Sequence, residues 1–291
     1  MSSTKIDYNN PLPEYEGLQF YVDAFNERRR IEQIMPIFYE EQPLTWMLYE
    51  GEITKHLSTC KDIKILDVGC GSGFWGLLLK KKFPQADVTC LDKNPLAIER
   101  ARYNSLLNHL KINLVEGLYD TSQFNFNTFD LIILTPPYHL YDPKDTERIP
   151  FFARGGDYGL QEFYTQSRIA FKHLKGNGII LFNQMSAGTN KPDYVERYNQ
   201  EFGVGKLEYT NILSPISTIS FLEGLYEHLE SEYLRNFAEK MPILYYTSGL
   251  YTKNDFPFVS LENTSDKYSV LSKMQENWQT RIELHKEINR F

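Results

Sequence analysis

Short apolar runs alternate with longer amphipathic segments through the first half of the chain. The pattern predicts strands at 63–68, 87–91, 112–116 and 130–134, with helices at 74–83 and 95–107 between them. Nearly all-apolar strands separated by helices are typical of a parallel sheet that is covered on both faces. Ligands of such sheets bind at the carboxyl ends of the strands.

The alternation resumes after a long irregular stretch, 135–158, which is rich in proline, aspartate and aromatic residues. A loop of that length in a compact domain is usually functional. Beyond it the pattern predicts helices at 159–174 and 191–202, an inserted helix near 220–240, and strands at 178–183, 206–212 and 243–252. We therefore expect an α/β fold with a seven-stranded, mostly parallel sheet flanked by helices.

Apolar positions at helical spacing mark both ends of the chain. They predict a leading helix over 18–38 and a second helix over 42–57, with Pro43 acceptable in its first turn. From Asp266 onward they predict an amphipathic helix that packs on the domain, with a dimer contact as the alternative. The expected organisation is a helical lead-in (1–58), an α/β core (59–256) and a C-terminal helical elaboration (257–291).

Composition narrows the class of protein. A chain of 291 residues can bury a sizeable core alone, and its three cysteines show no paired spacing that predicts disulfides or a metal site. The net charge of −7 opposes general attraction to phosphate backbones, so DNA is not expected as a partner. A basic run at 27–30 is either a local nucleic-acid contact or the solvated face of a helix. With no signal peptide and no long apolar stretch, a cytoplasmic protein without membrane contact is expected.

A glycine-rich turn follows the first predicted core strand. Gly69, Gly71 and Gly73 alternate with small residues before an apolar helical segment begins. Such a turn lets the backbone approach a nucleotide-type cofactor, and the free amides at the helix start can bind it. Residues 71–76 also satisfy the dinucleotide pattern GxGxxG, so two cofactor classes compete here.

Two acids bear on the choice of cofactor. Asp67 directly precedes the glycine turn, where we expect a carboxylate to face a cationic ligand such as S-adenosylmethionine rather than an anionic pyrophosphate. Asp92 ends the next predicted strand, where a carboxylate can accept hydrogen bonds from ribose hydroxyls in either cofactor class. The alternative for Asp92 is a simple cap of the helix that begins near Pro95.

The fourth predicted strand ends in Thr135-Pro136-Pro137-Tyr138. Two prolines fix the backbone and direct its carbonyls, so the segment can hold a planar amino group. The Pro136 carbonyl and the Thr135 hydroxyl would accept the protons of that nitrogen, while Tyr138 stacks on the flat acceptor. The alternative is a proline-rich turn that only closes the strand.

The order of these motifs resembles the class I methyltransferases of amino groups, which have a Rossmann-like fold. Residues 151–160, FFARGGDYGL, and 174–181, LKGNGIIL, narrow the resemblance to the HemK/PrmC family within the "methyltransferase small" group. That family methylates a glutamine amide in release factors, and its group includes RNA adenine methyltransferases. The resemblance implies S-adenosylmethionine as cofactor. It implies a cofactor site at Asp67, Gly69, Cys70, Gly71, Gly73, Asp92, Lys93, Gly117, Leu118 and Thr135, and a catalytic motif at Thr135, Pro136 and Tyr138.

Three departures from the family keep the acceptor open. Thr135 stands where the family usually has Asn, Gly117 stands where an acid often meets adenine, and the additions from Phe221 onward are not the family's. His139 is either a base or a packing residue. The aromatic residues that could line an acceptor pocket are Trp46, Tyr141, Phe151 and Phe152.

The sequence therefore predicts a methyltransferase that acts on an amide or exocyclic amine nitrogen of a protein side chain, an RNA base or a small molecule. Three alternatives remain. The first is O-methylation of a small molecule at the Thr135 site, which the acidic charge and the inserted helix favour. The second is a catalytically inactive binding protein with this fold, in view of Thr135 and Gly117. The third is a dehydrogenase.

Overall fold

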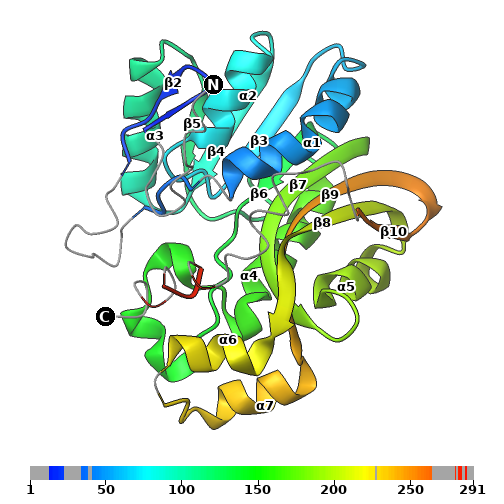
Figure 1. Cartoon of the computed structure of the whole chain (residues 1–291). Coiled ribbons are helices and arrows are strands. Elements are labelled where there is room, and N and C mark those ends of the chain that lie inside the picture. The colour runs from blue at the N-terminus through cyan, green and yellow to red at the C-terminus, as the bar shows by residue number, and fades with distance from the viewer. Residues whose placement is uncertain are drawn as a thin grey trace, which may run out of the picture.

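An eight-stranded sheet forms the centre of the protein (Figure 1). The structure, a computed structural model, describes residues 13–22, 34–38, 41–226, 228–263, 279, 281–283 and 286. The strand order is β10-β8-β9-β7-β6-β3-β4-β5, and β9 runs antiparallel to both of its neighbours while the other pairs are parallel. The strands are β3 (Lys64–Val68), β4 (Asp87–Asp92), β5 (Asn113–Glu116), β6 (Phe129–Leu134), β7 (Leu174–Gly188), β8 (Val204–Ser217), β9 (Ile243–Pro257) and β10 (Val259–Glu262).

The prediction of seven strands is wrong by one. β10 lies within the segment predicted as a C-terminal helical elaboration, and it pairs in parallel with β8, from Val259 opposite Lys206 to Glu262 opposite Tyr209. Its four residues alternate apolar and polar side chains over too short a distance to be recognised from periodicity. The strand β10 forms because β8 lies beside it in the folded protein and provides partners for its backbone hydrogen bonds.

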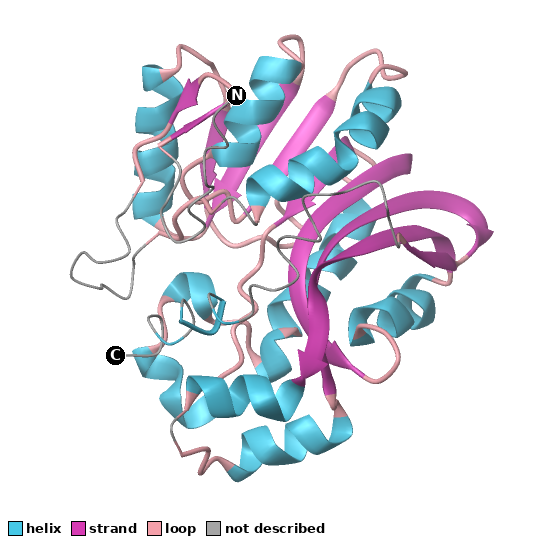
Figure 2. Ribbon diagram, in the orientation of Figure 1, coloured by secondary structure: helices cyan, strands magenta, loops and turns pink. Residues whose placement is uncertain are grey.

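Helices cover both faces of the sheet, as the nearly all-apolar strands predicted (Figure 2). Side chains alternate between the faces. Ile65 and Leu131 join the core that α1, α2 and α3 cover, whereas Leu66 and Ile132 join the core that α4 and α5 cover. These helices are α1 (Gln42–Leu57), α2 (Phe74–Lys82), α3 (Pro95–Leu107), α4 (Gln161–His173) and α5 (Asp193–Phe202).

The insertion predicted as one helix near 220–240 is two helices, α6 (Thr218–Leu225) and α7 (Glu232–Lys240), which contact each other. A separate serine caps each of them: Ser217 accepts from the Ser220 amide, and Ser231 accepts from the Leu234 amide. Because the second cap begins a new helix, the chain does not continue through this segment as one helix.

The predicted leading helix is wrong wherever its residues are described. Glu14–Tyr15 and Leu18–Gln19 pair as the short strands β1 and β2, and 34–38 has no regular structure. Glu16 and Gly17 have φ of 50° and 68°, and this left-handed turn reverses the chain so that the two strands pair. The basic run at 27–30 lies outside the described residues.

Of the predicted C-terminal helix, residues 279, 281–283 and 286 are described, and they are helical. Arg281 and Ile282 are buried against the domain. The remaining positions of its apolar repeat, Leu271, Met274, Trp278 and His285, lie outside the described residues. No helix in the described part of the chain is long and apolar enough to cross a membrane.

Candidate active site

A cavity of about 240 Å³ opens at the carboxyl ends of the parallel strands. Its lining includes the residues that follow β3, β4, β5 and β6, together with the middle of β7. The predicted site residues that line it are Gly69, Cys70, Gly71, Asp92, Lys93, Gly117, Leu118, Thr135, Pro136 and Tyr138. Neither Asp67 nor Gly73 is among the cavity-lining residues.

The glycine turn is held against the neighbouring strand. The amides of Gly69 and Cys70 both donate to the Leu91 carbonyl, at 2.8 and 3.1 Å. Gly69 has a φ of 73°, and a Cβ at this position would lie 3.3 Å from the Thr135 carbonyl oxygen. Only glycine combines this conformation with this approach at no steric cost. The turn is therefore packed directly on the motif that ends β6.

Gly73 serves the helix behind the turn. Its φ is 83°, and a Cβ here would lie 3.1 Å from the Ala101 Cβ. Since Ala101 belongs to α3, this glycine allows the start of α2 to approach that helix. Its position explains why it does not line the cavity.

Asp67 lies beneath the turn, where it has no exposed surface. It shares the face of β3 with Ile65, so its side chain points toward α2, and its Oδ2 accepts from the Gly76 amide at 3.2 Å. Burial and the nearby charge of Asp92 raise the pKa of Asp67 to about 7. The carboxylate that we expected to face a cationic ligand thus supports the helix start instead.

Asp92 joins two backbone turns at the cavity wall. Its Oδ2 accepts from the Gly71 amide at 3.0 Å, and its Oδ1 accepts from the Asn94 amide at 2.9 Å. Each oxygen retains a lone pair for a ligand hydroxyl. Burial raises the pKa of this carboxyl. The alternative that Asp92 caps α3 is wrong, because Asn94 is the cap and accepts from the Leu96 amide at 3.0 Å.

The motif after β6 is fixed from two sides. The Thr135 hydroxyl lies 3.0 Å from the Gly69 carbonyl and 3.2 Å from that of Val68, both of which accept from it. On the other side, Cβ atoms at Gly155 and Gly159 would lie 2.9 Å from the Pro137 oxygen and 2.5 Å from the Tyr138 oxygen. The glycines of 151–160 therefore let that loop lie against the motif backbone.

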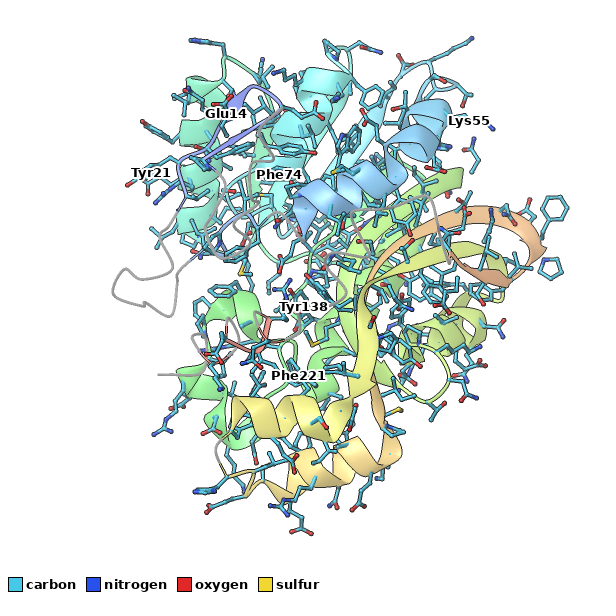
Figure 3. All side chains as sticks on the ribbon, viewed as in Figure 1. Glu14, Tyr21, Lys55, Phe74, Tyr138 and Phe221 are labelled. Atoms are coloured by element: carbon cyan, nitrogen blue, oxygen red, sulfur yellow. The ribbon has the colours of Figure 1, made fainter. Side chains whose placement is uncertain are left out.

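Tyr138 belongs to a buried polar network, and Figure 3 shows it between the main sheet and α6. Its hydroxyl donates to Glu41 Oε1 at 2.7 Å, and Arg281 Nη1 donates to the same oxygen at 2.9 Å. Arg281 Nη2 donates to the Tyr246 hydroxyl at 2.6 Å. Burial and the Glu41 carboxylate raise the pKa of Tyr138. The sequence analysis missed Glu41, Tyr246 and Arg281, because these partners are far apart in the chain and share no motif.

Several buried polar atoms around the cavity have no hydrogen-bond partner among the described residues. Those on side chains that line the cavity include Gln42 Oε1, Trp75 Nε1, Gln166 Oε1 and Asn183 Oδ1. Buried polar atoms of this kind are normally paired with protein, water or a ligand. The cavity therefore has the lining of a polar ligand site.

Of the four aromatic candidates, Phe151 and Phe152 line the cavity. Trp46 lies in the main core and Tyr141 packs with Ile149, and neither is among the cavity-lining residues. His139 lines the cavity and is 2% exposed. No group of three or more acidic, cysteine or histidine side chains in the described part of the chain could hold a metal ion.

The strand order, the antiparallel β9 and the glycine turn at the carboxyl end of β3 are those of the Rossmann-like fold of class I methyltransferases. The more particular assignment concerns one segment. The model of the methyltransferase small domain family matches residues 53–153, so this segment of the chain is similar to that domain. That match spans the glycine turn, Asp92 and the motif from Thr135 to Tyr138.

Curated relatives agree with this class. The chain is 29% identical over 206 residues to a release factor glutamine methyltransferase of Flavobacterium psychrophilum, covering 67% of this chain and 68% of the relative. It is 34% identical over 87 residues to a ribosomal RNA small subunit methyltransferase C of Pseudomonas putida, covering 30% and 26%. Among solved structures, a class I methyltransferase from Listeria monocytogenes aligns at a TM-score of 0.49 and 13% identity, over 88% of this chain and 74% of its own.

S-adenosylmethionine is the cofactor of this class, and the residues present fit it. Adding a Cβ to Gly69 would narrow the space beside the motif, and Asp92 offers carboxylate oxygens at the cavity wall. Carboxylate oxygens accept hydrogen bonds from sugar hydroxyls, as the nucleoside part of this cofactor requires.

Proposed function

We propose that the enzyme methylates a nitrogen, either an amide or an exocyclic amine, on a protein side chain, an RNA base or a small molecule. The observation that carries the proposal is the position of Thr135-Pro136-Pro137-Tyr138 in the same cavity as the glycine turn and Asp92. The relatives support it, because a glutamine side chain offers an amide nitrogen and an RNA base can offer an exocyclic one.

On the cofactor side, we assign the donor to the glycine turn and the two loops beside it. Asp92 would accept from the ribose hydroxyls through the lone pairs that its backbone contacts leave free. The other residues assigned to this side of the cavity are Gly69, Cys70, Gly71, Lys93, Gly117 and Leu118. Gly117 is positioned by its own amide, which donates to the Asp92 carbonyl at 2.9 Å.

On the acceptor side, the Pro136 carbonyl would accept a proton of the nitrogen, and the Tyr138 ring would stack on the planar group that carries it. When bound, the cofactor would supply an activated methyl group to the nitrogen lone pair, and its sulfur would take the electrons of the broken C–S bond. The protein aligns the nitrogen with that bond, and much of the rate enhancement comes from this alignment. The proton then leaves the nitrogen for water.

Calorimetry with S-adenosylmethionine tests the cofactor side. We expect micromolar binding to the wild type. Asp92→Asn should bind about ten- to a hundredfold more weakly, because a hydrogen bond to a charged carboxylate is lost. Glu116→Gln is the matched control, since Glu116 lies opposite Asp92 in the neighbouring strand and does not line the cavity. Equal affinity in all three proteins would contradict the assignment.

Labelled methyl transfer tests the acceptor side, with purified release factor, small-subunit ribosomal RNA and small amines and alcohols as acceptors. Mass spectrometry of the product then locates the methyl group. A methylated nitrogen is the expected result. Methylation of oxygen would support the alternative reaction, and donor binding without transfer to any acceptor would support a binding protein.

A further inference from the structure

Asn183 lies beside the motif that follows β6. In the pairing of β6 with β7, Leu134 lies opposite Phe182, so Thr135 and Asn183 come next on the two strands. Both side chains line the cavity, as does Tyr138. Positions 133 and 181 belong to the core under α1, and side chains alternate along strands, so 135 and 183 are directed to that same face. An amide group is thus adjacent to the place assigned to the acceptor nitrogen.

The Asn183 side chain is held in one orientation. Its Nδ2 donates to Thr45 Oγ1 at 3.2 Å and to Ser248 Oγ at 3.3 Å. The two hydroxyls are hydrogen-bonded to each other at 2.5 Å, so α1 and β9 jointly fix the amide nitrogen. The amide nitrogen is therefore turned toward α1 and β9, and the oxygen of the same amide is turned away from these two hydroxyls.

The other end of the same amide is unsatisfied. Asn183 is 7% exposed, and its Oδ1 has no hydrogen-bond partner in the described part of the chain. A buried carbonyl oxygen without a donor is unfavourable, and a ligand N–H in the cavity would remove that cost. The adjacent Thr135 hydroxyl differs, because its proton is directed to the backbone of the glycine turn.

We propose that Asn183 Oδ1 is an acceptor for the nitrogen that is methylated, and this inference rests on the proposed function. With the Pro136 carbonyl it gives two hydrogen-bond acceptors. A primary amide or amine has two N–H groups to match them, whereas a hydroxyl has one O–H. Asn183 therefore makes the site specific for an –NH₂ group and is the residue that recognises it.

The test uses two donor analogues and needs no knowledge of the acceptor. One is S-adenosylhomocysteine, which lacks the methyl group. The other is sinefungin, in which a carbon bearing a primary ammonium replaces the methyl-bearing sulfonium. The wild type should bind sinefungin more tightly, because its ammonium is directed toward the acceptor-binding groups. Asn183→Leu should reduce this preference at least tenfold and leave the affinity for S-adenosylhomocysteine within about twofold.

Asn211→Leu is the matched control, because this asparagine also lies on a strand of the sheet and is not among the cavity-lining residues. It should keep the wild-type preference. Asn183→Asp keeps an oxygen acceptor and should also prefer sinefungin. This variant provides the test if Asn183→Leu does not fold. Loss of the preference in Asn183→Asp, or its retention in Asn183→Leu, overturns the inference. A wild type that binds neither analogue overturns the proposed function itself, and the inference with it.

Discussion

The Asp67 carboxylate is enclosed between the glycine turn and α2. Its Oδ1 has no hydrogen-bond partner among the described residues, whereas Oδ2 accepts from the Gly76 amide. A carboxyl that is buried with few hydrogen bonds to stabilise its negative charge favours its protonated form. Burial accordingly raises the pKa of Asp67 to about 7. At the scale of single residues, this acid therefore acts on stability rather than by direct contact in the cavity.

The raised pKa predicts how stability depends on pH. The unfolded carboxyl ionises near its ordinary pKa of about 4, whereas the folded one keeps its proton until about pH 7. Stability should therefore fall as the pH rises between these values and level off above them. From pH 5 to pH 8 the loss due to Asp67 should be roughly 3 kcal/mol, at 1.4 kcal/mol per pH unit.

The side chain of Asp67→Asn cannot ionise. Between pH 5 and pH 8 the unfolding free energy of this variant should therefore fall by roughly 3 kcal/mol less than that of the wild type. Urea unfolding of both proteins at a series of pH values measures the difference. Parallel profiles for the two proteins would show that Asp67 does not titrate in this range.

At the scale of elements, α6 and α7 support the loop that follows the Thr135–Tyr138 motif. Tyr158 stacks on Tyr233 and Phe237, with ring centroids 5.3 and 4.5 Å apart, and Ser231 donates to Asp142 at 2.5 Å. None of the described residues of the two helices lines the cavity. The insertion thus packs on the outside of the loop, and the loop in turn packs on the Thr135–Tyr138 backbone.

Gly159→Ala should test how closely the loop must approach the motif. The new Cβ would lie 2.5 Å from the Tyr138 oxygen, at a φ of 70° that alanine adopts poorly. We expect a loss of about 2 to 4 kcal/mol in unfolding free energy and a larger loss of methyl transfer than of donor affinity. Gly176→Ala is the control, because nothing lies within 4 Å of its added Cβ. Similar unfolding curves for both variants would contradict the prediction.

At the scale of the whole molecule, the start of α1 and the C-terminal segment meet at the acceptor side of the cavity. The Glu41–Arg281 ion pair, 2.9 Å long, joins residues 240 positions apart, and both side chains are under 10% exposed. The Arg281 guanidinium also lies 4.4 Å from the Tyr246 ring centroid. Segments from both sides of the core domain therefore complete one wall of the site.

Arg281→Met should leave the Glu41 charge buried and uncompensated, which costs about 3 to 5 kcal/mol of stability. Adding Glu41→Gln should recover part of that loss, because the unpaired charge is removed. Lys286→Met is the control: its pair with Glu283 is partly exposed, and such pairs contribute at most about 1 kcal/mol. Denaturant unfolding of these three variants and of Glu41→Gln alone measures the coupling, and additive effects of the Arg281 and Glu41 changes would rule it out.

The sequence by itself determined the central part of the fold and most of the cofactor side. Between 63 and 134 the apolar runs predicted each strand and helix closely, because those strands are buried on both faces and their neighbours are strongly periodic. The glycine turn, Asp92 and the motif from Thr135 to Tyr138 were recognisable because each is a short pattern of residues at the end of a predicted strand. The leading helix failed at its start because the left-handed turn at Glu16 and Gly17 pairs Leu18–Gln19 with Glu14–Tyr15 as strands, which apolar spacing cannot report.

Only the tertiary structure decided the acceptor side. Asn183 is one polar residue in an apolar strand, and its role depends on hydroxyls supplied by α1 and β9. Glu41 and Arg281 likewise meet only after the sheet has formed. The direction of Asp67 also depended on which helix lies over its face of β3. Local patterns determine elements and turns. The groups that would select an acceptor come from segments that are distant in the chain, and local spacing does not predict which of these segments come into contact.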